Sequence, residues 1–386
     1  MTATRAYLDW NATAPLLDAA REAMVAALSA PSNASSVHRE GRQARRIVED
    51  ARRAVAALVG AGAHVVFTSG ATEAANLLLT PDWRMGRSPL RFSKLYVCAA
   101  DHPATLSGGR FARESVETLP VGRDGVLDLG ALRSALAVHD REAGLPMVAV
   151  HAANNETGVV QPLAEVAAAV KAAGGFLIVD AVQAAGRIPL DLSTGCGDFL
   201  ILSSHKMGGP QGAGAIVGVT DLAMPVPLLA GGGQEKGHRA GTENVAALGG
   251  FGAAARAAKA GPADAGRIAA LRDGFEAAVV AEWPNAEIYG KDAPRLPNTL
   301  FFGLPGVKAE TAQIAFDLAG IAVSAGSACS SGKVGPSHVL AAMGFGGDAG
   351  GIRVSIGAST GEAELRAFAA ALGQLGARRV SGRAAA

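Results

Sequence analysis

The alternation of short apolar runs with helical stretches between about residues 60 and 220 constrains this fold more than any other feature of the sequence. Helical periodicity predicts helices at 73–79, 103–113, 128–140 and 161–173. Strands that alternate with helices in this way form parallel sheets with crossover helices, so we expect an α/β domain. The predicted strands are VVFTS (65–69), KLYVCAA (94–100), MVAVHAA (147–153), GFLIVD (175–180), FLILSS (199–204) and GAIVGV (214–219).

A glycine-rich stretch separates this region from a second one. Loop residues at 231–233 and 237–242 are followed by an alanine-rich segment, 244–282, that reads as one long helix with a domain hinge near its start. Shorter apolar runs then alternate with helices, which predicts a smaller α+β domain, and the N-terminal segment could pack with either unit. The predicted strands are 286–290, 298–304, 320–326 and 351–357, and the predicted helices are 308–319, 336–343 and 361–377.

Charge and cysteine usage exclude several classes of protein. Lys plus Arg number 35 against 34 for Asp plus Glu, so no overall field favours nucleic acid or an anionic membrane. The longest stretch free of these charged residues, 54–72, carries His64 and several glycines and hydroxyls, so no transmembrane helix is predicted. The N-terminus lacks the features of a secretory signal, and we expect a cytoplasmic protein. Three widely spaced cysteines predict neither a disulfide framework nor a metal site.

In open α/β sheets ligands bind at the carboxyl ends of the strands, so the residues directly after each apolar run are the first candidates for a binding site. The first run ends in SGATE, where Gly70, Ala71 and Thr72 begin a helix. Free backbone N–H groups at such a position bind phosphate, although an ordinary helix cap explains the same letters. Asp180 ends a later strand and Gln183 follows it. Asp180 is either a helix cap or the carboxylate partner of a protonated cofactor ring nitrogen.

Lys206 follows the next strand, in SSHKMGGPQGAG. Alone it would be read as a solvated surface lysine. With Ser203 and His205 beside it, a phosphate-binding turn and Asp180 one strand earlier, it fits the Schiff-base lysine of a pyridoxal phosphate site.

Two further strand ends add groups suited to such a ring. His102 in AADHPA could cover one face of the ring, or act as a capping or core histidine. Asn154 and Asn155 in AANNETG could hydrogen-bond the phenolic oxygen of the cofactor.

The three cysteines differ in their surroundings. Cys98 lies inside an apolar strand, and Cys196 sits in a glycine turn with no charged helper for a thiolate nearby in sequence. Cys329 lies in a Ser- and Gly-rich stretch with Lys333 and His338 nearby, which can support a thiolate. Cys329 is therefore the candidate nucleophile.

Arg353 lies between apolar residues in GIRVSIG, where an unpaired guanidinium would be costly. Its partner is either a substrate carboxylate or an internal acid.

Read together, these strings resemble the NifS/IscS-like cysteine desulfurases, which are aminotransferase class V enzymes of pyridoxal phosphate fold type I. The resemblance covers nearly the whole chain in the correct order. It implies a mostly parallel seven-stranded sheet with flanking helices in a large domain, 14–258, and a smaller α+β domain, 1–13 and 259–386, that carries the Cys329 loop. The matching strings are YLDWNATAP (7–15), NASSVHREGR (33–42), TSGATEAAN, NNETG, DAVQAAG, SSHKMGGPQGAGA, GGGQEKGHRAGTEN (231–244), SAGSACSS and RVSIG.

The resemblance also implies a role for each candidate residue. For the cofactor, Lys206 forms the Schiff base, Asp180 pairs with the ring nitrogen, His102 stacks on the ring, Asn154 and Gln183 address the phenolic oxygen, and Gly70, Ala71, Thr72, Ser203 and His205 hold the phosphate. Thr242 reaches the phosphate of a neighbouring subunit, which implies a homodimer. For the substrate, Arg353 takes the carboxylate, helped by Asn155 or by residues near Asn33.

The implied reaction converts L-cysteine to L-alanine, with proton transfers by Lys206 and His102, and leaves the sulfur as a persulfide on Cys329. The long form of the loop from Cys329 to Pro336 resembles the NifS/IscS branch, which favours direct delivery of sulfur to an acceptor such as an iron–sulfur scaffold. Departures from the family pattern at Trp10, Ala75 and Gln211 touch none of this chemistry.

Two rival functions stand beside this reading. The first is another class V pyridoxal phosphate enzyme, a selenocysteine lyase or an aminotransferase, in which Cys329 is incidental. The second is a sulfur-relay or scaffold-binding protein without catalysis. The sequence does not identify the sulfur acceptor or the activity on selenocysteine.

Overall fold

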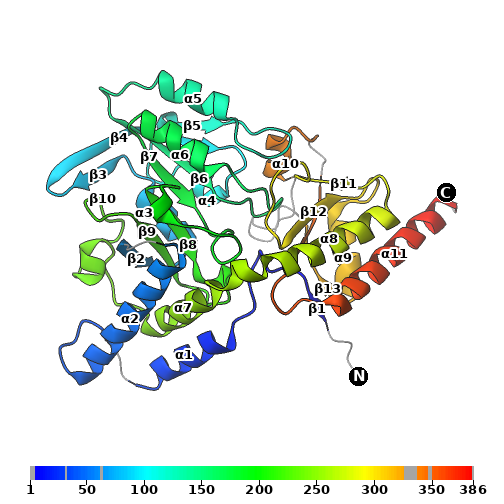
Figure 1. Ribbon diagram of the computed structural model, residues 1–386, viewed down its shortest axis with the longest axis horizontal. Helices are drawn as coiled ribbons and strands as arrows, with labels where there is room; N and C mark the ends of the chain where they lie inside the picture. The colour runs from blue at the N-terminus through cyan, green and yellow to red at the C-terminus, as the bar shows by residue number, and fades with distance from the viewer. Residues whose placement is uncertain (1–4, 31–32, 61–63, 326–336, 347–349, 385–386) are drawn as a thin grey trace.

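The computed structural model describes residues 5–30, 33–60, 64–325, 337–346 and 350–384. The predicted nucleophile, Cys329, lies outside the described residues. Figure 1 shows a large unit built around one broad sheet and a smaller unit that holds the C-terminal helices.

The large sheet has nine strands and follows the order β10-β3-β4-β6-β7-β8-β9-β2, with β5 paired to β4. The pairs β5–β4, β4–β6, β6–β7 and β7–β8 are parallel, whereas β9 runs antiparallel to both β8 and β2. The strands are β2 (His64–Thr68), β3 (Asp82–Met85), β4 (Ser88–Cys98), β5 (Val116–Leu119), β6 (Leu145–His151), β7 (Phe176–Asp180), β8 (Phe199–Ser203), β9 (Gly214–Gly218) and β10 (Ala223–Pro225).

The expected α/β fold is confirmed, with more strands than the sequence predicted. The six apolar runs are β2, β4 and β6 to β9, and β5 completes the mostly parallel seven-stranded sheet. Beyond these seven, β3 forms an antiparallel pair with the first part of β4, and β10 pairs with β3. Strand β3 escapes periodicity because three of its four residues are exposed, and β10 escapes it because it is a buried strand of just three residues.

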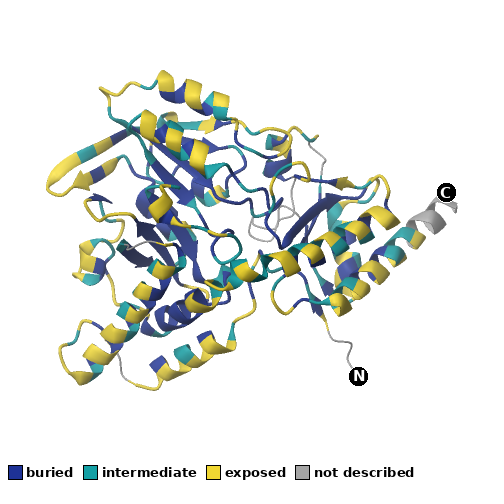
Figure 2. Ribbon diagram, in the orientation of Figure 1, coloured by how far each residue is buried: buried dark blue, intermediate teal, exposed yellow. Residues whose placement is uncertain are grey.

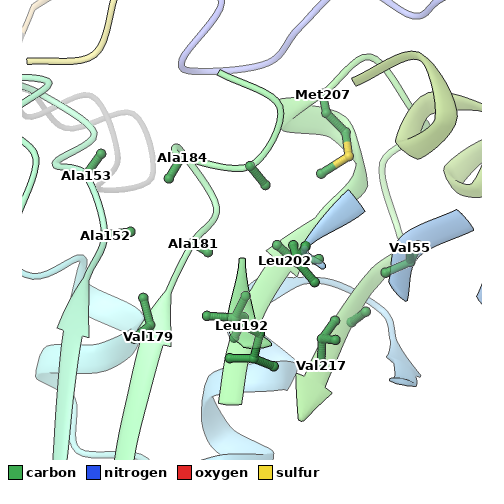
Figure 3. Close-up of a cluster of buried hydrophobic side chains, with 14 of the residues drawn as sticks. Val55, Ala152, Ala153, Val179, Ala181, Ala184, Leu192, Leu202, Met207 and Val217 are labelled. Carbon is green, nitrogen blue, oxygen red and sulfur yellow. The ribbon is translucent and has the colours of Figure 1, made fainter. Parts of the chain in front are cut away.

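Both faces of the large sheet are buried. Along β2, Val65 and Phe67 face one hydrophobic cluster and Val66 faces the other. The first cluster, part of which Figure 3 shows, lies under helices α2, α5, α6 and α7, and the second lies under α3. Figure 2 shows the resulting dark-blue sheet between helices whose outer faces are exposed. The helices of this unit are α1 (Asp18–Leu28), α2 (Arg39–Leu58), α3 (Ala71–Leu78), α4 (Pro103–Leu106), α5 (Leu129–Ala137), α6 (Leu163–Ala172) and α7 (Val245–Ala258).

Two predicted helices end or break early, the helix expected at 361–377 continues to Ala384, and two helices escaped prediction. The helix expected at 103–113 ends at Leu106, because Gly108 and Gly109 adopt positive φ angles of 77° and 59°. The helix expected at 244–282 is two helices, since the turn Gly261–Asp264 with its proline separates α7 from α8 (Ala265–Glu282). Helices α1 and α2 were missed, although buried residues 44, 48, 51 and 55 of α2 follow helical spacing.

The smaller unit contains a four-stranded antiparallel sheet of order β11-β12-β15-β14 and a two-stranded pair, β1–β13. The run expected as one strand at 320–326 is divided between β13 and β14. The elements are β1 (Ala6–Tyr7), β11 (Glu287–Ile288), β12 (Thr299–Gly303), β13 (Ile321–Ala322), β14 (Ser324–Ala325), β15 (Ile352–Ser355), α9 (Ala309–Leu318), α10 (His338–Ala342) and α11 (Glu362–Ala384).

The N-terminal segment packs with both units. Ala6 and Leu8 belong to the hydrophobic cluster of the smaller unit, whereas α1 and α2 lie against α7 of the large one. Helix α10 departs from the division by sequence, as do Tyr289, Leu296 and Phe301, because these apolar side chains belong to the cluster of the large unit. The domain boundaries expected at 13/14 and 258/259 stay a prediction. Among the described helices, none combines the length and apolar character needed to cross a membrane.

Candidate active site

A cavity of about 440 Å³ lies at the carboxyl ends of the large sheet's parallel strands. Its volume is in the range that binds small ligands and cofactors. The loops after β2, β4 and β6 and the ends of β7 and β8 all contribute to it, as expected for an open α/β sheet. Ten of the residues singled out in the sequence line this cavity: Gly70, Ala71, Thr72, His102, Asn155, Asp180, Gln183, Ser203, His205 and Lys206.

The start of α3 forms one wall of the cavity. The helix begins at Ala71, directly after Gly70 in extended backbone. A Cβ at Gly214 of β9 would lie 2.6 Å from the Cα of Gly70, so the close approach of these two segments requires glycine at position 214. Glu73 in the first turn is engaged by Arg239 at 2.9 Å. The first turn of α3 therefore offers N–H groups and a positive dipole end to an anion, while the charge of Glu73 is compensated.

Asp180 lies at the end of β7 and lines the cavity. Burial raises the pKa of its carboxyl, and a hydrogen bond from the Val182 N–H at 3.0 Å acts in the opposite direction. Within the described part of the chain no salt bridge reaches this carboxylate. A cationic group in the cavity would therefore find a counter-charge already buried there.

His102 caps a helix and also lines the cavity, so its capping role is present and its contact with a cofactor ring stays a prediction. Its Nδ1 accepts a hydrogen bond from the Ala104 N–H at 3.1 Å. Because a backbone N–H can only donate, Nδ1 is unprotonated and Nε2 carries the proton of the neutral ring. Burial lowers the pKa of His102, against the opposing effect of Asp180.

Lys206 follows the last parallel strand and is held by the N-terminal segment. Its Nζ donates to the carbonyl oxygens of Asn11 at 2.7 Å and Ala12 at 2.8 Å. The neighbouring His205 has a pKa lowered to about 4, first by burial and then by the charge of Lys206. His205 therefore lines the cavity as a neutral imidazole, whose Nδ1 lies 2.9 Å from the Thr13 hydroxyl.

Sequence reasoning missed Asn11, which joins the two units beside the cavity. Its carbonyl accepts from Lys206 and from Gln183 Nε2 at 3.0 Å. Its side-chain amide donates to Thr299 Oγ1 at 2.9 Å and to the Asn155 carbonyl at 3.3 Å. Its Oδ1 accepts from Asn298 at 3.1 Å. The string YLDWNATAP contained this residue, but nothing in the letters distinguished it from its neighbours.

His151 is a second lining residue that sequence reasoning missed, although it ends a predicted strand. Gln161 Oε1 accepts from the Leu127 N–H at 2.8 Å, which fixes the orientation of that amide. Gln161 Nε2 therefore donates to the Gly125 carbonyl and to His151 Nε2, at 2.9 and 3.0 Å. The His151 proton consequently lies on Nδ1 and is donated to Asp101 Oδ1 at 2.6 Å.

Cys98 lies close to this pair, and one ligand atom from each of Cys98, Asp101 and His151 falls within 4.8 Å of the others. Hydrogen bonds account for the grouping. Asp101 accepts from the backbone N–H groups of Cys98 and His151 as well as from the imidazole. Burial raises the pKa of the Cys98 thiol well above its usual value, and burial also raises that of Cys196. Neither is a favourable nucleophile.

Three candidates lie away from the cavity. Asn154 is buried and its side chain is used locally, since Nδ2 donates to the Ala100 carbonyl at 2.9 Å and Oδ1 accepts from the Glu156 and Thr157 N–H groups. Asn154 therefore does not reach a ring in the cavity, which Asn155 lines instead. Thr242 and Asn33 are exposed.

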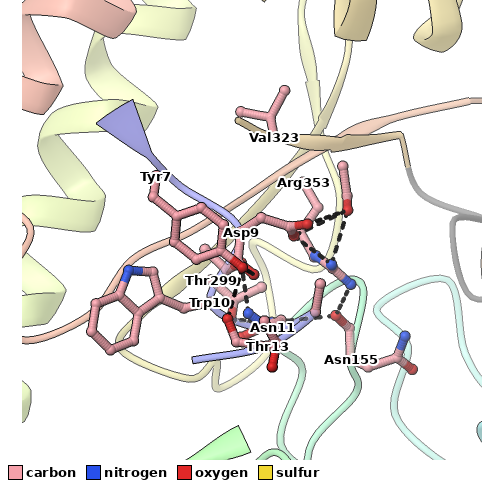
Figure 4. Close-up of polar contacts among 12 residues, drawn as sticks. Tyr7, Asp9, Trp10, Asn11, Thr13, Asn155, Thr299, Val323 and Arg353 are labelled. Atoms are coloured by element: carbon pink, nitrogen blue, oxygen red, sulfur yellow. Dashed lines mark hydrogen bonds and ion pairs between the residues drawn. The ribbon is translucent and has the colours of Figure 1, made fainter. Parts of the chain in front are cut away.

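Arg353 is engaged inside the protein, as Figure 4 shows. The guanidinium donates to Asp9 Oδ1 at 2.8 Å, to Ser324 Oγ at 3.1 Å and to the Asn155 carbonyl at 2.9 Å. Its Nε is buried without a partner among the described residues. Of the two readings of Arg353, the internal ion pair is therefore present, and the contact with a substrate carboxylate stays a prediction.

Comparisons with known proteins identify the family of this chain. The family model "Aminotransferase class-V" matches residues 6–368. The chain is 39% identical to a cysteine desulfurase of Cereibacter sphaeroides, over 94% of this chain and 93% of that protein. It is 38% identical to an IscS-like cysteine desulfurase of Mycobacterium tuberculosis, over 94% of each chain. The solved NifS-like protein of Rickettsia africae superposes with a TM-score of 0.86 at 30% identity, covering 96% of this chain and 99% of the other. The resemblance found in the sequence is thus confirmed, and this chain belongs to the aminotransferase class V family.

Proposed function

We propose that this protein is a pyridoxal phosphate-dependent cysteine desulfurase. It converts L-cysteine to L-alanine and passes the sulfur to Cys329 as a persulfide. The observation that carries the proposal is the meeting of four separate groups in one cavity: the first turn of α3, His102, Asp180 and Lys206. Each alone has an ordinary structural explanation, but together they match the phosphate, ring face, ring nitrogen and aldehyde of one cofactor.

The residues present fit that cofactor. Asp180 supplies a buried carboxylate for the protonated ring nitrogen, whose charge would relieve the burial that raises the pKa of Asp180. The first turn of α3 with Thr72, Ser203 and neutral His205 would hold the phosphate. Asn155 rather than Asn154 would address the phenolic oxygen beside Gln183, because the Asn154 side chain is turned into its own loop. When bound, pyridoxal phosphate supplies an electron sink for the bonds at the substrate Cα.

Lys206 and His102 would move the protons. Lys206 Nζ, which would hold the cofactor aldehyde, would also take the proton from the substrate Cα. The Asn11 and Ala12 carbonyls, which accept from Nζ in the structure, can hold the resulting ammonium within the cavity. His102 keeps its proton on Nε2 and would be the second group that moves protons in the cavity.

Sulfur transfer requires the Cys329 thiolate. Its attack on the substrate sulfur forms an S–S bond as the substrate C–S bond breaks, and the electron pair of that bond stays on the substrate carbon, which becomes a methyl group of alanine after protonation. Arg353, with Asn155 and Asn33, is proposed to bind the substrate carboxylate. Arg353 would then exchange or share its hydrogen bonds with Asp9.

We further propose that the protein acts as a homodimer and delivers the persulfide sulfur to an acceptor such as an iron–sulfur scaffold. The exposure of Thr242 is compatible with a residue that serves the cavity of a neighbouring subunit. The family to which the chain belongs supports both proposals.

The test is the visible spectrum of the purified protein before and after addition of L-cysteine, with alanine and sulfide assayed in parallel. We expect a Schiff-base band that shifts with L-cysteine in wild type and in Cys329→Ala, and alanine formation in wild type alone. A shift with undiminished alanine formation in Cys329→Ala contradicts the nucleophile assignment and favours another class V reaction. A protein that cannot be loaded with the cofactor contradicts the whole proposal.

A further inference from the structure

Helix α10 lies between two strands of the smaller unit in the sequence but packs against the large unit. The strands that precede and follow it, β14 and β15, are neighbours in the sheet of the smaller unit. Val339, Leu340 and Met343 nevertheless pack in the hydrophobic cluster of the large unit. In Figure 1 α10 accordingly lies apart from α8, α9 and α11. The stretch that contains Cys329 is therefore attached to the smaller sheet at Ala325 and to the large unit at Ser337.

Ser337 is attached to the large unit through Glu156, a buried acid that takes no part in the proposed reaction. Ser337 Oγ donates to Glu156 Oε2 at 2.6 Å and accepts from the Leu340 N–H at 3.1 Å, so the hydroxyl caps α10 and joins it to Glu156. Glu156 is 2% exposed and Ser337 3% exposed. Burial raises the pKa of Glu156 to about 7, although the bond from Ser337 acts to lower it. A buried carboxyl with this short bond is expected to hold its partner firmly.

The side chain of Asn154 fixes the backbone of the loop that carries Glu156. The Asn154 side-chain oxygen accepts from the Glu156 N–H at 2.9 Å and the Thr157 N–H at 3.0 Å. The other end of the amide donates to the Ala100 carbonyl, next to the turn that carries His102. The two asparagines of NNETG thus have different tasks, since Asn155 lines the cavity and Asn154 braces the acid.

A second contact docks α10 on the His102 turn. His338 Nε2 lies 2.9 Å from the carbonyl of Asp101, the residue before His102. Because a carbonyl can only accept, His338 donates this bond. Helix α10 is therefore tied to the two turns that place Asn155 and His102 in the cavity.

We propose that Glu156 and Ser337 are positioning residues for sulfur transfer. By fixing the start of α10 to the large unit, they set the point from which the Cys329 stretch is presented to the cavity. Neither residue lines the cavity, so neither touches the cofactor or the substrate. This inference rests on the proposed desulfurase function, and it gives a role to Glu156, the acid of the NNETG string.

The experiment compares Ser337→Ala and Glu156→Leu, which remove the bond, with Glu156→Gln, which retains an acceptor of the same shape. Asp128→Ala is the matched control, because Asp128 caps α5 through the Gly130 and Ala131 N–H groups and has no docking role. Three quantities are measured on the cofactor-loaded protein: the L-cysteine concentration that half-shifts the spectrum, the rate of alanine formation, and hydrogen exchange at the amides of α10.

We expect the half-shift concentration to stay near the wild-type value in all four variants. Alanine formation should fall about tenfold or more in Ser337→Ala and Glu156→Leu, since a small misplacement of a reacting group carries a penalty of this order. Both variants should exchange faster at α10, whereas Glu156→Gln and Asp128→Ala should resemble wild type in every readout.

Alanine formation that is unchanged while α10 exchanges faster would overturn the positioning role, and unchanged exchange would overturn the docking itself. A parallel loss of spectral response and alanine formation would show damage to the cavity rather than mispositioning, and it too would overturn the proposal. A wild type that makes no alanine overturns the proposed function and the positioning role with it, while hydrogen exchange still reports whether Glu156 docks α10.

Discussion

The two sheets of this protein treat their buried polar residues differently. In the large sheet, polar groups follow the carboxyl ends of successive parallel strands and meet in one cavity. In the smaller, antiparallel sheet, Arg353 lies in the middle of β15, and its guanidinium is bonded to Asp9, Ser324 and a backbone carbonyl. Parallel strands bring all their carboxyl ends to one edge, whereas antiparallel strands send alternate ends to opposite edges.

The two units thus separate the buried polar groups that can bind a ligand from those that stabilise the fold. Asp180 is buried without a salt bridge among the described residues, and its raised pKa marks a charge that the fold alone does not stabilise. Asp9 is paired with a buried arginine, and Ser324 Oγ donates to both of its oxygens at 3.0 Å. The first arrangement is suited to a ligand, and the second holds the protein together.

The largest expected effect tests the cavity through Lys206. We expect Lys206→Ala to lower alanine formation about 10³-fold or more, because it removes both the covalent link to the cofactor and the base at Cα. Folding should be retained, since the described hydrogen bonds of Nζ are to backbone carbonyls at the cavity wall, those of Asn11 and Ala12. Alanine assays and circular dichroism check these outcomes. Lys171→Ala, an exposed lysine on α6, is the control.

The next effect concerns the smaller unit and is one of stability. Asp9→Asn should lower the free energy of unfolding by about 3 kcal/mol, because it leaves the buried Arg353 without its counter-charge. The comparison is sharpened by Asp180→Asn, which should not destabilise the cofactor-free protein, since the raised pKa means that the carboxylate opposes folding. Urea unfolding of both variants is the measurement, and equal destabilisation would break the contrast.

A third prediction uses the pH dependence of Glu156 at the junction of the units. Its pKa is about 7 in the folded chain against 4.5 as a model value, so the folded state binds more protons between these values. Ionisation of Glu156 therefore lowers stability as pH rises through this window, by about 3 kcal/mol in all.

Glu156→Gln cannot titrate, so its stability relative to wild type should rise as the pH goes from 4.5 to above 7. Urea unfolding across this range compares the two proteins directly. A stability difference that does not change with pH would show that Glu156 titrates normally.

The smallest effect calibrates the others. Asp128→Ala removes an exposed helix cap of the large unit and should lower stability by about 1 kcal/mol, without changing alanine formation. A loss of stability as large as that of Asp9→Asn would mean that exposed and buried polar contacts stabilise the protein equally, which contradicts the contrast between them. Urea midpoints of the two variants measured together decide this point.

Periodicity predicted the strands of the large sheet well because those strands are buried on both faces and rich in apolar residues. It failed for β3, which is mostly exposed, for β10, which is just three residues long, and for the helix at 103–113, which two glycines with positive φ cut short. Many of the residues expected to act together line one cavity for the same topological reason, since a residue directly after a parallel strand lies at the ligand edge of the sheet, and their roles stay predictions.

The amino-acid sequence alone shows which chemical groups follow the strands, and it also shows the family, because both depend on residue type and on the order of residues along the chain. Only the tertiary structure decided which of two adjacent asparagines faces the cavity, which acid pairs with Arg353 and which unit α10 joins. These choices depend on the direction of a side chain within a turn and on partners hundreds of residues away. Neither is a property of local spacing, since both are fixed only in the folded chain.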